Sequence, residues 1–234
     1  MYFPLYALVC ADAKKEKYNV KFQKEMLTLY AVTDRTWLHG RTLAEVVEQV
    51  IRGGVTMVQL REKGKSEAEI LQAAQEVLPV CRKYGVPFIV NDSIELARRV
   101  GADGVHLGQS DVPEGDVRKL AQGLILGMSA NTVESAQRAA ALGADYLGVG
   151  AVFGTTTKHD ARHLSPERLR EITAAVNVPV VAIGGINANN ILQLSGCGMQ
   201  GAAVVSALFA QDDPQNAARR LRTLAEQMKQ EGTR

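Results

Sequence analysis

The stretch Pro87-Phe88-Ile89-Val90-Asn91-Asp92 decides the fold that we expect for this chain. Three consecutive large apolar residues follow a proline and end at an Asn-Asp pair, which is typical of a short strand buried on both faces of a parallel sheet. A second run of this kind, Gly104-Val105-His106-Leu107, leads through a polar turn to Asp111. Carboxylates at the ends of two neighbouring strands indicate a cation between them.

The same order of a short apolar run, a polar loop and a helical segment repeats along the chain from Leu27 onward. We expect eight strands, at 27–32, 56–60, 88–90, 104–107, 124–128, 146–149, 178–183 and 202–205. Capping residues predict helix starts at Thr42 with Glu45, Ser66 with Glu69, Asn131 with Glu134, Ser165-Pro166 and Asp213-Pro214. A helix-ending glycine precedes each even-numbered strand, at Gly54, Gly101, Gly143 and Gly198.

This alternation predicts an α/β fold, a single-domain (β/α)8 TIM barrel, because right-handed crossovers close such a chain into a ring. An open, doubly wound sheet is the alternative, although no GxGxxG fingerprint follows the first strand. We place the barrel at residues 27–234 and treat residues 1–26 as an N-terminal extension. The basic and polar part of this extension, residues 14–25, predicts at most one outer helix.

The composition excludes several classes of protein. Of the 234 residues, 46% are hydrophobic, 22% are charged and 5% are aromatic, which is typical of a globular α/β enzyme. The net charge of +2 comes from scattered Lys and Arg without a basic block, so we expect no nucleic-acid partner. No apolar run approaches the roughly 20 residues of a membrane span, so we expect no membrane partner.

Three cysteines, Cys10, Cys81 and Cys197, show neither a CxxC motif nor a zinc-binding spacing. Their odd number favours a reducing compartment, and we expect the protein in the cytoplasm. The apolar start of the chain lacks the basic residue of a secretory signal. The sequence leaves a homodimer open.

Polar residues and glycines follow seven of the eight predicted strands, at the end where TIM barrels hold their active sites. They are Gln59, Arg61, Lys63, Asn91, Asp92, Gln109, Asp111, Ser129, Asn131, the run Gly154-Thr155-Thr156-Thr157-Lys158, the pair Gly184-Gly185, and Ser206. We therefore expect these residues to surround one site.

Alternation along Gln59-Leu60-Arg61-Glu62-Lys63 places Gln59, Arg61 and Lys63 on one side, and Leu60 and Glu62 on the other. An amide and two cations suit a diphosphate, which accepts paired bonds from Arg and a point charge from Lys. The alternative is a solvated loop whose cations form surface ion pairs.

Asp92 and Asp111 are hard oxygen ligands suited to Mg²⁺, which binds through one or two carboxylates plus substrate phosphates. The alternative for Asp92 is a cap on the helix that follows Ser93. The Thr-rich run before Lys158 and the residues after the last two strands suit phosphate binding. His106, which lies inside a strand, is interpreted as a hydrogen-bonded interior histidine and stays outside the catalytic set.

Several of these motifs together resemble one family, the thiamine-phosphate synthases (thiamine monophosphate pyrophosphorylases). The resemblance runs from Leu29-Tyr30-Ala31-Val32-Thr33-Asp34 to about Leu208. It rests on Gln59-Leu60-Arg61-Glu62-Lys63, Val90-Asn91-Asp92, Gly104-Val105-His106-Leu107-Gly108-Gln109 with Asp111, Gly127-Met128-Ser129, Thr155-Thr156-Thr157-Lys158, Ala182-Ile183-Gly184-Gly185-Ile186 and Val205-Ser206.

The resemblance implies a Mg²⁺-dependent transferase with two small-molecule substrates. It would join 4-amino-5-hydroxymethyl-2-methylpyrimidine diphosphate to 4-methyl-5-(2-hydroxyethyl)thiazole phosphate, release pyrophosphate and give thiamine monophosphate. The residues implied to bind the pyrimidine diphosphate are Gln59, Leu60, Arg61, Glu62, Lys63, Asn91, Ser129 and Lys158. Those implied to bind the thiazole phosphate are Thr155, Thr156, Thr157, Gly185, Val205 and Ser206.

The resemblance also implies that Asp92 and Asp111 hold Mg²⁺, and that Arg61, Lys63, Ser129 and Lys158 take part in catalysis. One departure is Asn131-Thr132, where many members carry His-Thr. A thiazole tautomerase-like isomerase and a non-catalytic phosphate-binding barrel are the alternatives. Both would need the phosphate site after the last two strands, but neither would need the acid pair together with the full set of cations.

Overall fold

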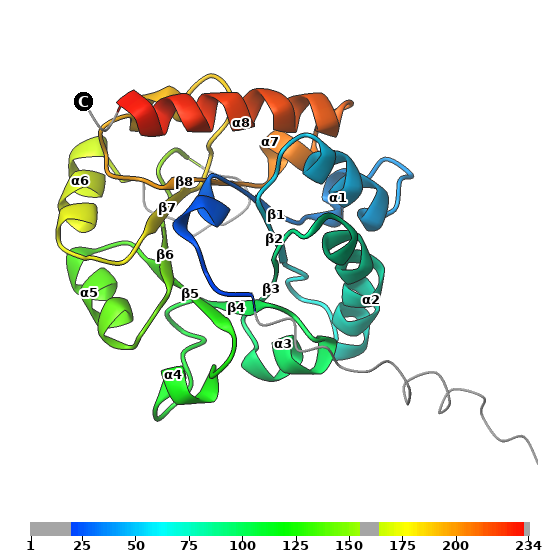
Figure 1. Cartoon of the computed structure of the whole chain (residues 1–234), viewed down its shortest axis with the longest axis horizontal. Helices are drawn as coiled ribbons and strands as arrows, with labels where there is room; N and C mark the ends of the chain where they lie inside the picture. The colour runs from blue at the N-terminus through cyan, green and yellow to red at the C-terminus, as the bar shows by residue number, and fades with distance from the viewer. Residues whose placement is uncertain (1–19, 155–163, 232–234) are drawn as a thin grey trace, which may run out of the picture.

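The computed structural model describes residues 20–154 and 164–231. Within these residues, eight parallel strands close into a barrel in sequence order, and β8 pairs with β1 (Figure 1). The strands are β1 Leu29–Val32, β2 Met57–Leu60, β3 Phe88–Asn91, β4 Gly104–Leu107, β5 Ile125–Ala130, β6 Tyr146–Val149, β7 Val180–Ile183 and β8 Gly201–Val204. The predicted barrel is therefore confirmed, and the open sheet is excluded.

Helices surround the barrel and connect successive strands (Figure 1). The α-helices are α1 Leu43–Arg52, α2 Glu67–Tyr84, α3 Ile94–Val100, α4 Val117–Leu120, α5 Val133–Ala141, α6 Pro166–Ala174, α7 Ser206–Phe209 and α8 Pro214–Glu231. Short 3-10 helices are η2 Lys24–Leu27, η3 Arg35–Trp37 and η4 Ile191–Leu194, of which η4 stands where a helix would connect β7 to β8. In the part of the chain that the structure describes, no helix is long and apolar enough to cross a membrane.

Four of the five predicted helix starts are confirmed by hydrogen bonds. Capping side chains accept from the backbone at Thr42, Ser66, Ser165 and Asp213. The fifth prediction, Asn131 with Glu134, is wrong by one residue. Thr132 caps α5 by accepting from the amide of Ser135, and the Ser135 hydroxyl in turn accepts from the amide of Thr132. Successive residues here all have capping side chains, so the sequence alone could not fix the position.

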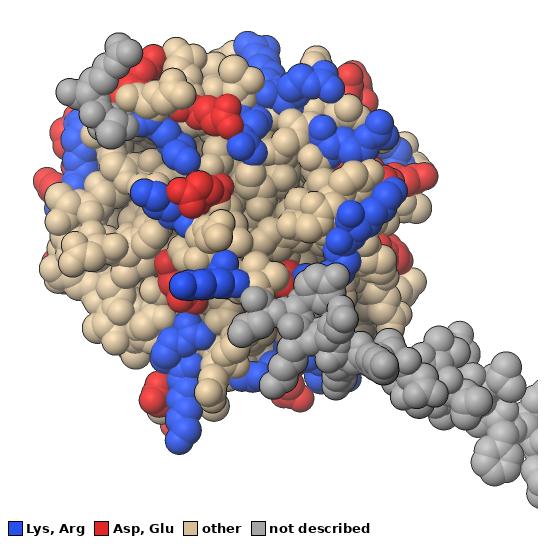
Figure 2. Space-filling view, in the orientation of Figure 1, with Lys and Arg blue, Asp and Glu red and all other residues tan. Residues whose placement is uncertain are grey.

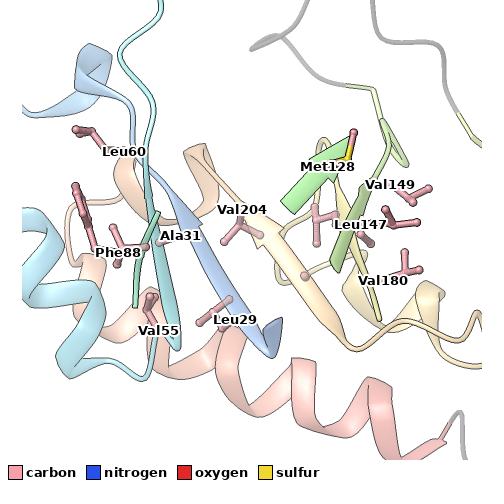
Figure 3. Close-up of a cluster of buried hydrophobic side chains, with 14 of the residues drawn as sticks. Leu29, Ala31, Val55, Leu60, Phe88, Met128, Leu147, Val149, Val180 and Val204 are labelled. Atoms are coloured by element: carbon pink, nitrogen blue, oxygen red, sulfur yellow. The ribbon is translucent and has the colours of Figure 1, made fainter. Parts of the chain in front are cut away.

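Alternate strand residues divide between two apolar layers. Leu29 and Ala31 of β1 face the helices and belong to a large cluster between the strands and the helices, part of which is drawn in Figure 3. Tyr30 and Val32 face the barrel interior and belong to a smaller cluster with residues such as Tyr146. The alternation of side chains along each strand thus builds the outer core and the barrel interior from the same short segments.

The residues just before β4 and β6 hold the upstream ends of the strands together. Asp103 accepts from the amide of Phe88 at 2.8 Å and pairs with Arg82, while Asp145 accepts from the amide of Leu126 at 2.7 Å. All four glycines predicted before even-numbered strands have positive φ, at 110°, 72°, 83° and 77° for Gly54, Gly101, Gly143 and Gly198. At this end of the barrel, the residues before the strands therefore hold neighbouring strands together and turn the chain from helix to strand.

Part of the predicted N-terminal extension packs into the barrel. The blue segment that precedes β1 in Figure 1 lies across the barrel opening, and its Val20, Phe22 and Met26 contact the interior cluster. The space-filling view from the same side shows acidic and basic side chains interspersed (Figure 2). Residues 20–26 therefore close the upstream end of the barrel. In the described part of the proposed outer helix, residues 20–25, the helical structure is the start of the 3-10 helix η2, which begins at Lys24.

Candidate active site

A cavity of about 510 Å³ opens at the carboxyl ends of the strands, where the sequence predicts the site. The predicted site residues that line it are Gln59, Arg61, Lys63, Asn91, Asp92, Gln109, Asp111, Ser129, Asn131, Gly184, Gly185, Val205 and Ser206, whereas Gly154 is not part of the lining. The side chains of Leu60 and Glu62 are not part of this lining. The predicted run Thr155, Thr156, Thr157 and Lys158 lies outside the described residues.

The end of β2 presents its polar side chains as the alternation predicts. Leu60 is 1% exposed in the outer core, and the Glu62 carboxylate accepts from Arg35 at 2.9 Å. Burial raises the pKa of Glu62, although the positive charge of Arg35 opposes the shift. The chain direction here is fixed by Thr33, whose hydroxyl accepts from the amide of Arg61 at 3.0 Å.

The two cations at this strand end remain available to a ligand. Within residues 20–154 and 164–231, neither Arg61 nor Lys63 forms an ion pair within 4.0 Å. Both line the cavity, and their positive charges oppose the rise in the pKa of Asp92 that its burial causes. Two cations held beside a cavity suit an anionic group with several oxygens.

Asp92 does not cap the helix after β3. Ser93 does so by accepting from the amide of Leu96 at 3.1 Å, while Asp92 adopts a left-handed backbone with φ of 68°. This conformation is uncommon for a residue with a Cβ, although Asp adopts it more readily than most, and such residues cluster at active sites. The alternative interpretation of Asp92 as a helix cap is therefore wrong.

Asp92 and Asp111 lie together at the ends of β3 and β4. Burial, the negative charge of Asp111 and a hydrogen bond with Asp111 raise the pKa of Asp92, and they outweigh the opposing charges of Lys63 and Arg61. One oxygen of Asp111 accepts from the amide of Gly108 at 3.1 Å. Two adjacent carboxylates in this position repel each other, and a divalent cation would remove the repulsion.

Asp92 and Asp111 are the carboxylates that line the cavity in the described part of the chain. Among the described residues, no group of three or more His, Cys, Asp or Glu side chains could hold a metal ion. A site with two carboxylates suits Mg²⁺, which keeps several waters and takes further oxygens from substrate phosphates. It does not suit a structural zinc, which needs four protein ligands.

The loops after β7 and β8 bring backbone close to the cavity. Gly184 and Gly185 have φ of 103° and 69°, and a Cβ at position 185 would lie 2.6 Å from the carbonyl oxygen of Phe153. Val205 and Ser206 follow β8 and line the same cavity. Glycine is required at position 185 for two reasons: a Cβ would clash with the backbone of the loop after β6, and the backbone has a positive φ.

Two residues on the cavity floor were not predicted as site residues. Tyr30 is 1% exposed and His106 is 8% exposed, and both line the cavity. The ring nitrogens of His106 lie 3.1 Å from Tyr146 Oη and 3.0 Å from Ser129 Oγ, which confirms the interpretation of an interior, hydrogen-bonded histidine. Tyr30 faces inward by the alternation of Leu29-Tyr30-Ala31-Val32, and this signal could have identified it.

Comparisons with known proteins agree with one another. The family described as "Thiamine monophosphate synthase" matches residues 29–208. A thiamine-phosphate synthase of Ruminiclostridium cellulolyticum is 52% identical over 195 residues, 83% of this chain and 93% of that protein. One of Clostridium tetani is 48% identical over 195 residues, with the same coverage of 83% and 93%.

A solved structure supports the same assignment. The chain resembles a thiamine phosphate pyrophosphorylase from Pyrococcus furiosus with a TM-score of 0.80 and 38% identity, covering 88% of this chain and 98% of that one. The matched region spans all eight strands and the cavity that they surround. The chain therefore belongs to the thiamine monophosphate synthase family.

Proposed function

We propose that the chain carries out the reaction of its family through the cavity residues described above. It couples 4-amino-5-hydroxymethyl-2-methylpyrimidine diphosphate with 4-methyl-5-(2-hydroxyethyl)thiazole phosphate to give thiamine monophosphate and pyrophosphate. The observation that carries this assignment is the convergence of two cations, Arg61 and Lys63, and two carboxylates, Asp92 and Asp111, on one cavity. This charge pattern suits a diphosphate bound together with a divalent cation.

We propose Asp92 and Asp111 as the residues that hold Mg²⁺. Their oxygens are the donor type that Mg²⁺ prefers. Burial and the negative charge of Asp111 raise the pKa of Asp92, and a bound cation would relieve the repulsion between the two carboxylates. When bound, Mg²⁺ supplies positive charge to the oxygens of the diphosphate. Asn91, which ends β3 beside this pair, lines the cavity and is placed to bind the same substrate.

The reaction requires positive charge near the leaving diphosphate and correct orientation of the two substrates. The bond between the exocyclic carbon and the diphosphate oxygen breaks, its electron pair leaves with the diphosphate, and the thiazole nitrogen uses its lone pair to form the new carbon–nitrogen bond. No proton has to be removed from the thiazole nitrogen. Arg61 and Lys63 stabilise the negative charge that grows on the leaving group, and we assign the same role to Lys158, outside the described residues.

The thiazole phosphate is assigned to the loops after β7 and β8. Gly185, Val205 and Ser206 line the cavity there, which is the position where TIM barrels frequently hold a phosphate. We assign Thr155, Thr156 and Thr157 to the same phosphate from the sequence, since they lie outside the described residues. The two substrates would then approach each other across the barrel mouth, with their reacting atoms between them.

The direct test is product analysis by chromatography with both substrates and Mg²⁺. We expect thiamine monophosphate and pyrophosphate in equal amounts, and we expect EDTA to stop their formation. A tautomerase-like isomerase would convert the thiazole substrate alone, and a binding barrel would retain thiazole phosphate without turnover. Either result, with no coupled product when each substrate in turn is in excess, would replace the synthase assignment.

We also propose that the protein works in the cytoplasm. The support is that Cys81 and Cys197 are both free and buried, whereas a secreted protein tends to pair its cysteines in disulfides. Fractionation of cells that produce the tagged protein tests this proposal, and recovery in a secreted fraction would contradict it.

A further inference from the structure

A continuous line of hydrogen bonds crosses the barrel interior beneath the cavity. The Gln59 amide nitrogen donates to Tyr30 Oη at 2.7 Å, and Tyr30 Oη lies 2.8 Å from Tyr146 Oη. Tyr146 Oη lies 3.1 Å from His106 Nδ1, and His106 Nε2 lies 3.0 Å from Ser129 Oγ. We call these five residues the central relay. Its two ends, Gln59 and Ser129, are residues assigned above to the pyrimidine substrate.

Two glycines make room in the barrel interior for the rings of the central relay. Gly127 of β5 pairs in register with both His106 of β4 and Tyr146 of β6. A Cβ at Gly127 would lie 2.5 Å from Cε1 of Tyr146 and closer still to its Cζ and Oη. A Cβ at Gly148 would lie 3.1 Å from Cε1 of His106. Two glycines on neighbouring strands therefore leave the space that the two rings occupy.

The assigned donor at the start of the central relay is the Gln59 amide. The Gln59 amide donates to Tyr30 Oη and takes one of its two acceptor positions. In the direction that continues from this donor, Tyr30 donates its single proton to Tyr146 Oη, and Tyr146 donates its proton to His106 Nδ1. Burial raises the pKa of both tyrosines, so both hydroxyls keep their protons to donate.

This direction implies one protonation state of the histidine ring. With Nδ1 accepting from Tyr146, the neutral ring of His106 carries its proton on Nε2 and donates to Ser129 Oγ. Ser129 Oγ then accepts inside the barrel and directs its own proton toward the cavity that it lines. In the described part of the chain, the Gln59 amide oxygen has no hydrogen-bond partner. Every fully buried side-chain oxygen or nitrogen there has a partner, so this oxygen is not fully buried. Because Gln59 lines the cavity, its amide oxygen is available there as an acceptor.

We propose that Tyr146 and His106 are positioning residues that present Ser129 as a hydrogen-bond donor, opposite the acceptor of Gln59, to the aminopyrimidine ring. An aminopyrimidine offers an N–H donor and a ring-nitrogen acceptor, which match this pair. The proposal rests on the proposed function, because it deepens the roles of Gln59 and Ser129 in that reaction. His106, held in one tautomer, would then serve substrate recognition by orienting Ser129, in addition to packing in the barrel interior.

The N-terminal segment supports the relay from below. The Phe22 ring is stacked on the Tyr146 ring with centroids 5.8 Å apart and an angle of 19° between the planes. Tyr30 packs edge-on against the same ring, with centroids 5.9 Å apart. Tyr146 is thus held on two sides, which limits the ring to the orientation that reaches His106.

The test combines nitrogen-15 NMR of the histidine ring with steady-state kinetics on the full-length protein. In the wild type we expect the His106 signals, assigned by comparison with His106→Gln, to show a protonated Nε2 and an unprotonated Nδ1. In Tyr146→Phe, which keeps the ring and removes only the hydroxyl, we expect a mixture of the two tautomers. We expect KM for the pyrimidine diphosphate to rise about tenfold, as for one lost hydrogen bond, while KM for the thiazole phosphate stays within about twofold.

Tyr84→Phe is the matched control, since it removes an exposed hydroxyl that donates to Glu48 far from the cavity, and it should change neither readout. Tyr30→Phe is a second variant in case Tyr146→Phe folds poorly, and we expect a smaller change of the same kind. A wild-type His106 protonated on Nδ1, or an unchanged tautomer and KM in Tyr146→Phe, would overturn the proposal. The NMR result does not depend on turnover. If the NMR shows the expected tautomer but the synthase assay gives no product, the proposed function is refuted and the hydrogen-bond arrangement of the central relay still stands.

Discussion

Replacement of Gly127 by alanine should show how tightly the barrel interior is built. Gly127 lies between His106 and Tyr146 in the strand register, and Tyr146 is fully buried. A methyl group there would lie 2.5 Å from Cε1 of Tyr146, well inside the contact distance of about 3.5–4.0 Å between carbon atoms. The Tyr146 ring cannot move away freely, because Phe22 is stacked against it.

The expected cost follows from this overlap. Overpacking of a closely packed interior costs about 1–3 kcal/mol in the free energy of unfolding. For a chain of this size, each kcal/mol lowers Tm by roughly 2–4 °C, so we expect Gly127→Ala to melt about 2–12 °C below the wild type. Because the displaced ring carries the hydroxyl that contacts His106, KM for the pyrimidine diphosphate should rise as well.

Two other glycines give a graded control in the same calorimetric assay. A Cβ at Gly148 would lie 3.1 Å from His106 Cε1, so Gly148→Ala should cost less than Gly127→Ala. A Cβ at Gly154 would meet no atom within 4 Å, so the Tm of Gly154→Ala should be close to that of the wild type. Equal Tm values for Gly127→Ala and Gly154→Ala would refute the reasoning, since they would show that Tyr146 does not occupy the space beside Gly127.

Three further predictions concern the site and the thiols. Asp92→Ala and Asp111→Ala should each abolish Mg²⁺-dependent turnover without lowering Tm, and wild-type activity in both variants would remove the metal site. Arg61→Ala and Lys158→Ala should each lower kcat by about 10²–10³, the scale for losing one group that stabilises developing charge, and a loss of tenfold or less would make them solvated loop residues. Burial raises the pKa of Cys81 to about 12, so its thiol should resist alkylation at pH 8 until the protein unfolds, and rapid labelling of the native protein would contradict its burial.

The sequence predicts the strand order well because the pattern repeats. Each of the eight strands was expected, and the observed ends differ from the expected ends by at most two residues. Those small shifts matter for the site, since Ser129 lies inside β5, where it can reach His106, and was expected after the strand. Strand ends depend on hydrogen bonds between neighbouring strands, which a single run of residues does not reveal.

The alternation of side chains predicted the site better than the resemblance alone did. The resemblance assigned the whole run from Gln59 to Lys63 to the substrate, whereas alternation separated Leu60 and Glu62 from the other three. The structure follows the alternation for the side chains, with Leu60 in the outer core and Glu62 bonded to Arg35. A contact between the substrate and the backbone of these two residues stays a prediction.

The central relay could not be found from sequence because its members lie far apart in the chain. Tyr30 and Tyr146 are separated by 116 residues, and each taken alone is an aromatic residue in an apolar strand. Only barrel closure brings β1 and β6, which do not pair with each other, around one interior where the two hydroxyls meet. Likewise, nothing in residues 20–26 marks them as part of the barrel until Phe22 is seen against Tyr146.

The central claim is that Asp92 and Asp111 hold a divalent cation beside Arg61 and Lys63, the two cationic residues proposed to bind the diphosphate. Isothermal titration calorimetry of inorganic pyrophosphate, with and without Mg²⁺, tests it without requiring turnover. At equal free Mg²⁺, we predict that the ion strengthens binding to the wild type by about tenfold or more and has no such effect on the Asp92→Asn, Asp111→Asn double variant. The same response to Mg²⁺ in both proteins would contradict the account.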